Sequence, residues 1–164
     1  MTKMSGKLFV CLMVTLIGKT MGSSQAMKDI TTGFTKGLDE CKTELGLTEV
    51  VMKDLYNYWK EDYELLNRDV GCAIKCLSGK LNLLDPSGRL HHGNAADFAK
   101  AHGADDDVAT KVVQIIHACE KPHDAIEDEC TRVLEIAKCF RTEVHTLKWA
   151  PDMTVIIEEV LTEI

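Results

Sequence analysis

The sequence predicts an all-α fold, a single disulfide-tied domain of about six helices. Apolar residues recur at helical spacing along most of the chain, whereas strand signals are almost absent. Once an N-terminal leader is set aside, six cysteines remain, an even number that implies three disulfides in a secreted chain. The 164 residues are enough for one domain with a real core, and no internal repeat or linker divides them.

Residues 1–22 have the pattern of a secretory signal peptide. Lys3 and Lys7 give a positive start, residues 8–17 form an apolar run, and small residues precede the expected cleavage after Gly22. The apolar run is too short to span a bilayer. We therefore expect a secreted, extracellular protein without a membrane anchor.

The expected mature domain, residues 23–164, is acidic. The whole chain carries a net charge of −7. The leader removes three of the 19 basic residues and none of the 26 acidic ones, which leaves a net charge of −10. This balance disfavours binding to nucleic acid or to anionic membrane surfaces.

Two helices are expected in the first third of the domain. The first covers residues 27–44, where Gly33 and Gly37 weaken the helix and predict a bend. Thr48 is the expected N-cap of the second, at residues 50–59. That helix would end in a cluster of aromatic side chains.

The stretch Gly71–Asp85 is the predicted hub of the fold, in a helix opened by Asn67 or Asp69. Cys72 and Cys76 are four residues apart, so both sulfurs project from one helix face and each should bridge to a different segment. The opposite face collects Val70, Ile74, Leu77, Ser78 and Leu81. We hypothesise that this face lines an apolar cavity with Ser78 as its polar contact. The alternative is that Ser78 is a small residue at a tight helix crossing.

Three further helices follow a loop at residues 85–93, whose Asp-Pro-Ser-Gly run favours a turn. Asn94 is the expected cap of a short helix that holds Phe98. The acids at residues 105–107 should cap the next helix, and Pro122 should end it.

A long last helix is expected from residue 126 to about 148, opened by Asp124 and Glu127 as a capping box. The tail, residues 152–164, combines apolar residues with carboxylates. Protonation of those carboxylates would leave a helix apolar enough to enter a cavity. The alternative is a tail helix packed on the surface.

Histidine is the side chain that normally changes charge between pH 5 and 8. His91, His92 and His117 therefore admit a pH gate, but also a metal site or an ordinary solvated or capping role. No carboxylate or cysteine completes a recognisable metal spacing, so no metal is expected.

An enzymatic role is not expected. The sequence shows no Ser-His-Asp arrangement, no glycine-rich phosphate loop and no metal-ligand motif. The paired acids Glu158 and Glu159 are adjacent on a helix and do not face a common site. No cofactor is expected either.

The cysteine spacing, with 30, 3, 42, 10 and 8 residues between successive cysteines from Cys41 onward, carries a family resemblance. It resembles the insect odorant-binding protein family. The chain is similar to the moth pheromone-binding proteins of that family in four sequence segments. These are LDECK, NYWKEDYE, NRDVGCAIKCLSGKLNLLDPSGRLHHGNAADFAKAHGADD and HTLKWAPDM. The similarity spans nearly the whole mature chain.

This resemblance implies helices around an internal apolar cavity, with disulfides Cys41–Cys76, Cys72–Cys130 and Cys119–Cys139. It implies a small hydrophobic volatile ligand, a long-chain unsaturated alcohol, aldehyde or acetate. The ligand-binding positions carried over by matching are Phe34, Ser78, Phe140, Trp59, Phe98, Ile74, Met27, Leu90 and Ile136. Tyr58 departs from the phenylalanine of some relatives.

The resemblance also implies release of the ligand at acidic pH. His91 and His92 would lie at the base of a loop over the cavity mouth. The gate would further include His117 and the tail acids Glu158 and Glu163, and Thr154 replaces an aspartate of some relatives. Contact with an olfactory receptor or a membrane surface, pairing of two copies, and residence in the sensillar lymph are further expectations.

Two other classes of secreted helical protein fit the six cysteines. One is a saposin-like module that binds lipids or disrupts membranes. The other is a helical signal that occupies a receptor, which would have a solid core.

Overall fold

The computed structural model describes residues 22–152, and this part of the chain is helical. Residues 1–21, which are most of the predicted signal peptide, and residues 153–164 of the tail, with Thr154, Glu158 and Glu163, lie outside the described residues. Helical residues 22–34 are followed by η1 (Thr35–Gly37), α2 (Leu38–Leu45), α3 (Glu49–Tyr56), α4 (Arg68–Lys80), α5 (His92–Ala101), α6 (Asp106–Glu120), η2 (Lys121–His123) and α7 (Glu129–Thr146). Within residues 22–152, strand-like pairing is limited to an isolated bridge between Leu84 and Leu90. The predicted all-α class is confirmed.

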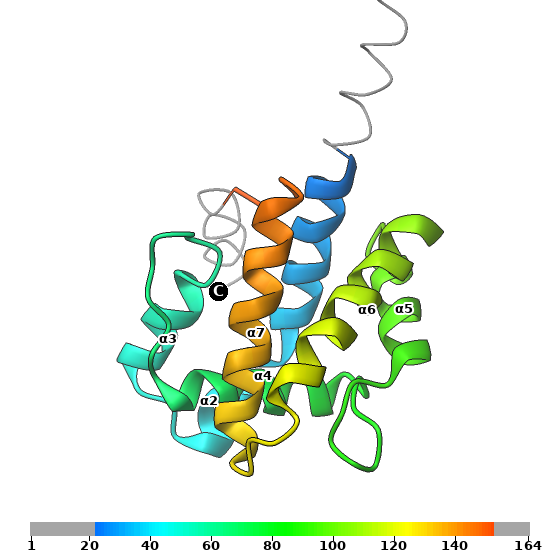
Figure 1. Cartoon of the computed structure of the whole chain (residues 1–164). Coiled ribbons are helices and arrows are strands. Elements are labelled where there is room, and N and C mark those ends of the chain that lie inside the picture. Colours follow the sequence, from blue (N-terminus) through cyan, green and yellow to red (C-terminus); the bar gives the residue numbers. More distant parts are fainter. Residues whose placement is uncertain (1–21, 153–164) are drawn as a thin grey trace, which may run out of the picture.

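The helices surround α7, which runs through the middle of the molecule beside helical residues 22–34 (Figure 1). α4 crosses below and behind α7, and these two helices form the most extensive contact between elements. α2 and α3 lie on one side of this pair, and α5 and α6 lie on the other. No helix within residues 22–152 combines the length and the apolar character needed to cross a bilayer.

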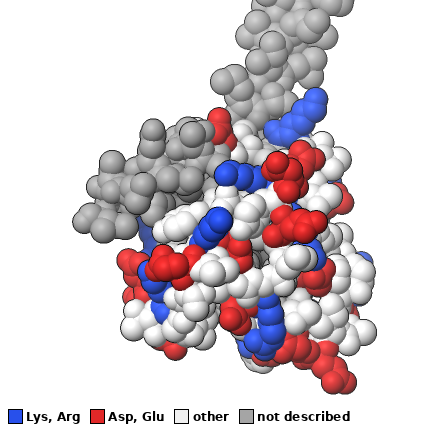
Figure 2. Space-filling view, turned by 90° about the vertical axis from the view of Figure 1, so that its left-hand side faces the viewer, with Lys and Arg blue, Asp and Glu red and all other residues white. Residues whose placement is uncertain are grey.

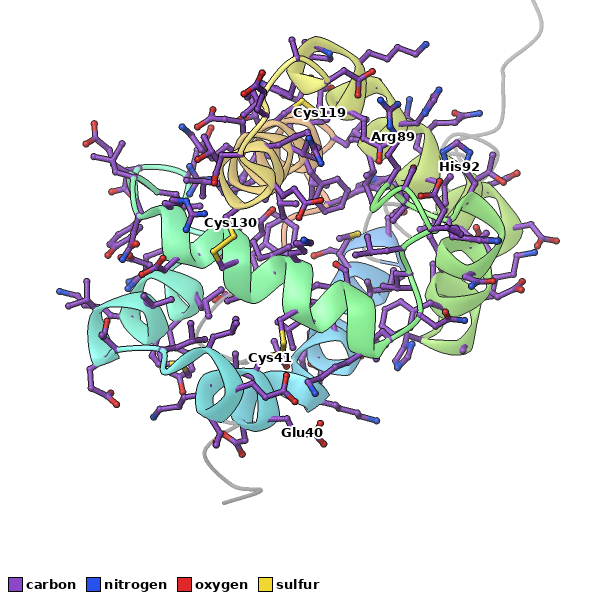
Figure 3. All side chains as sticks on the ribbon, turned by 90° about the horizontal axis from the view of Figure 1, so that it is seen from below. Glu40, Cys41, Arg89, His92, Cys119 and Cys130 are labelled. Atoms are coloured by element: carbon purple, nitrogen blue, oxygen red, sulfur yellow. A yellow bond between two sulfur atoms is a disulfide. The ribbon has the colours of Figure 1, made fainter. Side chains whose placement is uncertain are left out.

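Three disulfides tie these elements together, with the expected pairing. They join α2 to α4 through Cys41–Cys76, α4 to α7 through Cys72–Cys130, and α6 to α7 through Cys119–Cys139. Figure 3 shows Cys130 and Cys41 at two places along α4. The prediction that Cys72 and Cys76 bridge to different segments is therefore confirmed, and α4 is the hub of the fold.

The crossing of α4 with the first turns of α7 is very close, and we call it the α4–α7 seam. A Cβ atom placed on Gly71 would lie 1.9 Å from the backbone oxygen of Cys130, which no side chain tolerates. Arg68 donates two hydrogen bonds to the carboxylate of Asp128, one of 2.6 Å, and Lys75 pairs with Glu129. Glycine and paired charges thus bring the two helices together.

The first expected helix is broken rather than merely bent. Residues 35–37 form a 3₁₀ turn, after which α2 begins at Leu38. Gly37 is the N-cap of α2, and Gly33 is needed for packing because the His102 ring lies 2.1 Å from where its Cβ would be. The two glycines flagged in the sequence therefore mark this break.

The second helix ends earlier than expected. α3 stops at Tyr56, with Thr48 at its N-cap as predicted, but the hydroxyl of Thr48 makes no capping bond. Trp59 lies outside the helix, where its ring is buried and its indole N–H donates to the hydroxyl of Thr31. Tertiary contacts of the aromatic residues therefore override the local helical pattern.

Among the described helices, α4, α5, α6 and α7 have side-chain N-caps, and for α4 and α6 the observed cap is among the residues that the sequence suggests. Asn67 caps α4 and Asp105 caps α6, as predicted. α7 begins at Glu129 and not at residue 126, because the cap is Asp128, which accepts from the backbone N–H of Thr131. The expected capping box of Asp124 and Glu127 is therefore wrong.

The cap of α5 also differs from the prediction. The N-cap is His91, whose Nδ1 accepts a 3.2 Å hydrogen bond from the backbone N–H of Asn94. The side chain of Asn94 instead donates to the backbone oxygen of Asn82. A histidine cap is uncommon among N-caps, so residue preference points to Asn94 while the fold uses His91.

Candidate ligand-binding site and histidine cluster

Most of the buried apolar residues fall into two clusters. The first lies among residues 22–34, α5, α6 and α7, and its members are Ala26, Met27, Trp59, Ala99, Ala104, Val108, Ala109, Val112 and Val144. The second lies among α2, α3, α4 and α7, and its members are Leu38, Cys41, Leu47, Val51, Met52, Leu65, Val70, Ala73, Leu77 and Leu134. Tyr58 packs against both clusters.

Three of the predicted ligand-binding residues belong to the first cluster. Met27 and Trp59 are buried in it, and the half-buried ring of Phe140 packs against it. The Trp59 and Phe140 ring centroids are 6.1 Å apart, and the Tyr58 and Trp59 centroids are 4.9 Å apart in an edge-on arrangement. These rings form one aromatic group next to α7.

Hydrogen bonds fix this aromatic group to α7. The Tyr58 hydroxyl donates to the backbone oxygen of Ala137 at 2.6 Å, and burial raises the pKa of this phenol above its ordinary value. Arg141 donates to three backbone oxygens of the segment after α3, those of Tyr58, Lys60 and Tyr63. The polar end of Tyr58 is therefore satisfied by the protein, and its ring presents an apolar edge.

Phe34 and Ile74 pack against the second cluster, and both are half-buried. The Ser78 hydroxyl, also half-buried, donates a 2.8 Å hydrogen bond to the backbone oxygen of Ile74 one turn earlier on α4. Val70 and Leu77, on the same predicted face, are fully buried. The face of α4 thus has a packed part and a part that keeps accessible surface.

The other predicted ligand-binding residues lie nearer the periphery. Phe98 lines a depression of about 340 Å³ beside the end of α4, and its ring centroid is 4.3 Å from that of His102. Leu90 pairs with Leu84 in the isolated bridge, and Ile136 is half-buried on α7. A second depression of about 370 Å³ lies between α6 and α7, and none of the predicted ligand-binding residues lines it.

The loop before α5 is held by a network around Asp85. Its carboxylate accepts from the backbone and hydroxyl of Ser87 and from the backbone N–H of Arg89, and the Ser87 contact lowers the pKa of Asp85. Arg89 pairs with Asp124 at 3.0 Å, beyond the end of α6. The predicted turn is confirmed, and polar contacts connect the loop to Glu120 at the end of α6 and to Asp124 just beyond it.

The histidines at the base of this loop meet the end of α6. The ring centroids of His92 and His117 are 4.8 Å apart, and His117 Nδ1 lies 3.5 Å from a carboxylate oxygen of Glu120. The buried carboxylate of Glu120 also accepts a 2.9 Å hydrogen bond from the backbone N–H of Leu90. Figure 3 places His92 and Arg89 together on the α5–α6 side of the molecule.

Glu120 is a candidate site residue that the sequence does not single out. It follows His117 by three residues, a spacing that puts both side chains on one helix face. That signal was present in the sequence, but nothing in the sequence indicates that His92 lies beside them.

The other three histidines make a different kind of hydrogen bond. The rings of His102, His123 and His145 donate to the backbone oxygens of Phe98, Cys119 and Trp59. A donating ring nitrogen keeps its proton when the imidazole becomes charged. The capping Nδ1 of His91 is an acceptor, so protonation of that nitrogen would end its bond.

Comparisons with known proteins agree with this architecture. The model of the PBP/GOBP family matches residues 23–143. The chain is 45% identical over 157 residues to pheromone-binding protein 2 of Epiphyas postvittana, covering 96% of this chain and 95% of that protein. It is 39% identical over 149 residues to general odorant-binding protein 2 of Heliothis virescens, covering 91% and 92%.

A solved structure is similar as well. The crystal structure of Epiphyas postvittana pheromone-binding protein 3 superposes with a TM-score of 0.65 at 68% sequence identity. The match covers 70% of this chain and 98% of that chain. The fold described above therefore has a counterpart in an experimentally determined protein.

Proposed function

Because the chain belongs to the PBP/GOBP family, we propose that it is a secreted carrier that encloses a small, apolar, volatile molecule. The family consists of binding proteins and not of enzymes, in agreement with the absence of catalytic motifs in the sequence. A carrier makes and breaks no bond, so its affinity comes from the apolar surface that it removes from water. The saposin-like and signalling alternatives have no comparable support.

The observation that carries the proposal is the division of the apolar interior. Phe34 and Ile74 pack against one cluster and Phe140 against the other, yet all three keep accessible surface. Partly buried apolar side chains on neighbouring helices offer surface that a ligand can remove from water. An apolar chain lying between the clusters would cover them, with about 0.8 kcal/mol gained per buried methylene.

The ligand class that we propose is a long-chain unsaturated alcohol, aldehyde or acetate. The faces of Phe34 and Phe140 suit polarizable alkene bonds. The Ser78 proton is already donated to the Ile74 backbone oxygen, so its hydroxyl oxygen is best used as an acceptor. This arrangement favours a ligand that donates, and an alcohol should bind more tightly than the acetate of the same chain.

This preference can be measured by competition against a fluorescent probe at pH 7. The alcohol should displace the probe at a lower concentration than the matched acetate, and Ser78→Ala should remove most of that difference. A single hydrogen bond contributes about 1 kcal/mol, which is roughly fivefold in affinity. Equal affinities of alcohol and acetate in the unmodified protein would contradict the role given to Ser78.

We further propose that acid releases the ligand through the loop before α5. Protonation of His91 would remove the acceptor that caps α5 and place a positive charge at a helix N-terminus, where it is unfavourable. Charged rings of His92 and His117 would repel across 4.8 Å, whereas Glu120 would attract His117 and Arg89 would stay paired with Asp124. The loop would then loosen at its α5 end first.

The tail is the second part of the proposed release. Glu158 and Glu163 lie outside the described residues, so the proposal rests on their chemistry alone. Deleting residues 152–164 should preserve binding at pH 7 and abolish the acid-induced loss. Continued release at pH 5 by the truncated chain would remove the tail from the mechanism. Receptor or membrane contact, pairing of two copies and residence in the sensillar lymph stay predictions.

The experiment that tests the carrier proposal is a titration with an apolar fluorescent probe, N-phenyl-1-naphthylamine, at pH 7 and pH 5. The protein should bind one probe saturably at pH 7 and lose it at pH 5, and Phe140→Ala should weaken binding severalfold. Leu66→Ala is the matched control, because Leu66 is 75% exposed in the segment before α4 and should not affect the probe. Absence of saturable binding at pH 7 would refute the carrier role.

A further inference from the structure

We propose that His92, His117 and Glu120 form a zinc-binding site that joins the start of α5 to the end of α6. One ligand atom from each of these side chains lies within 4.8 Å of the other two. His92 is the first residue of α5, and His117 and Glu120 lie in the last turn of α6. The three residues are thus brought together by the fold from segments separated by 25 residues or more.

The donor set suits zinc. Two imidazole nitrogens and one carboxylate, with water in the fourth position, are a common zinc environment. All six cysteines of residues 22–152 are in disulfides, so no thiolate competes for the ion there. Calcium and magnesium require sets of oxygen ligands and should bind poorly.

The distances require little rearrangement. In a tetrahedral site with zinc–ligand bonds of about 2.0–2.1 Å, neighbouring donor atoms are about 3.3 Å apart. His117 Nδ1 and the Glu120 oxygen, 3.5 Å apart, are already close to that separation. His92 has an exposed side chain, which can rotate to close the remaining gap.

The environment of Glu120 is the strongest argument. This carboxylate is only 7% exposed, and a buried charge is costly unless it is paired. One oxygen accepts from the backbone N–H of Leu90, which fixes the orientation of the group, and the other faces His117. A backbone bond that orients a ligating carboxylate is typical of metal sites, and a bound cation would supply the missing positive charge.

The test is a calorimetric titration of the mature, disulfide-bonded chain without a histidine tag, with Zn²⁺ in chelator-free buffer at pH 7.5. One ion should bind per chain, and Ca²⁺ should give no comparable signal. His117→Asn and Glu120→Gln should each weaken zinc binding about tenfold or more. His123→Asn is the control, because His123 lies just beyond α6 with its Nδ1 bonded to the Cys119 oxygen, and this variant should bind like the unmodified protein.

A second readout locates the ion. Imidazole resonances of His92 and His117 should shift on zinc addition, whereas those of His102 and His145 should not. No binding, equal weakening by His123→Asn, or full affinity in His117→Asn would overturn the proposal. Glu120→Gln keeps an acceptor for the Leu90 N–H, and circular dichroism checks that it folds. Because no apolar ligand is present, this test can fail or succeed independently of the carrier proposal.

Discussion

The α4–α7 seam and the junction of the loop, α5 and α6 are both built around helix N-termini, but with opposite chemistry. At the seam, Asp128 caps α7 and pairs with Arg68, which lowers the pKa of that carboxyl well below its ordinary value. At the junction, a neutral imidazole nitrogen of His91 caps α5. One cap is thus an ion-paired carboxylate and the other an accepting imidazole nitrogen, and our proposal of acid release assigns the pH sensitivity to the second.

The sign of the pH effect at the seam follows from the depressed pKa values. Lys75 likewise lowers the pKa of Glu129. A carboxylate with a lowered pKa stabilises the folded state above its ordinary pKa and loses that contribution only as the pH falls through the lower, folded value. The seam, which also carries the Cys72–Cys130 disulfide, should thus be intact at pH 5.

The two parts of the molecule thus differ in the interactions that hold their helix N-termini. One half has a helix cap held by the Arg68–Asp128 ion pair beside the Cys72–Cys130 disulfide. The other half is also tied to α7, by Cys119–Cys139, but the cap of its α5 helix is an accepting histidine nitrogen. Figure 2 shows that acidic and basic side chains are interspersed on the described part of the α2–α3 face. The contacts to which we assign the proposed acid sensitivity lie on the α5–α6 side.

The largest expected effect comes from breaking the seam with Gly71→Ala. The added methyl would meet the Cys130 backbone oxygen, so α4 and α7 must separate, and we expect roughly 3 kcal/mol of destabilisation. Gly79→Ala on the same helix is the control, since nothing lies within 4 Å of its added methyl. That variant should be more stable by about 0.5–1 kcal/mol. Urea unfolding at pH 7 measures both, and equal stabilities of the two variants would contradict the description of the seam.

The second-largest expected effect concerns the α5 cap at the junction. His91→Asn replaces a titrating cap by one that caps at any pH, so α5 should keep a cap worth about 1 kcal/mol at pH 5. At pH 7 the variant should behave like the unmodified protein. Probe release on acidification, measured in EDTA so that no metal contributes, should shift to lower pH. An unchanged release profile would remove His91 from the mechanism.

The smallest effect concerns charge at the seam. Asp128→Asn keeps a capping oxygen but loses the ion pair with Arg68. The variant should be less stable than the unmodified protein at pH 7, and the difference should shrink as the pH approaches 2, where the carboxylate pair weakens. Urea midpoints at several pH values test this. A difference that is constant with pH would show that the lowered pKa of Asp128 does not contribute.

The sequence predicts the helical class and the hub helix of this fold better than it predicts the helix caps. Cysteine spacing and hydrophobic periodicity suffice for the helical class and the hub, and the family resemblance supplies the disulfide pairing. Two of the four side-chain caps observed in the described helices, Asn67 and Asp105, follow residue preference. The other two do not. His91 caps α5 in place of Asn94, and Asp128 caps α7 in place of the expected capping box of Asp124 and Glu127. A cap depends on where the chain enters the helix, which tertiary contacts decide.

The predicted site shows the same limit. Periodicity places Ile74 and Ser78 on one face of α4, and both are half-buried there. Periodicity does not indicate that Phe34 and Phe140 pack against different clusters, or that Glu120 lies close to His92. Contacts between segments far apart in the chain arise from helix crossings, and local spacing carries no information about them.

The most direct test of the account is hydrogen exchange of the ligand-free protein at pH 7 and pH 5, in EDTA, resolved by peptide and corrected for the intrinsic pH dependence of exchange. Protection of residues 91–98 should fall at pH 5, while protection of residues 128–135 should stay unchanged. Equal loss of protection in both segments, or no loss in either, would contradict the assignment of acid sensitivity to the α5 side.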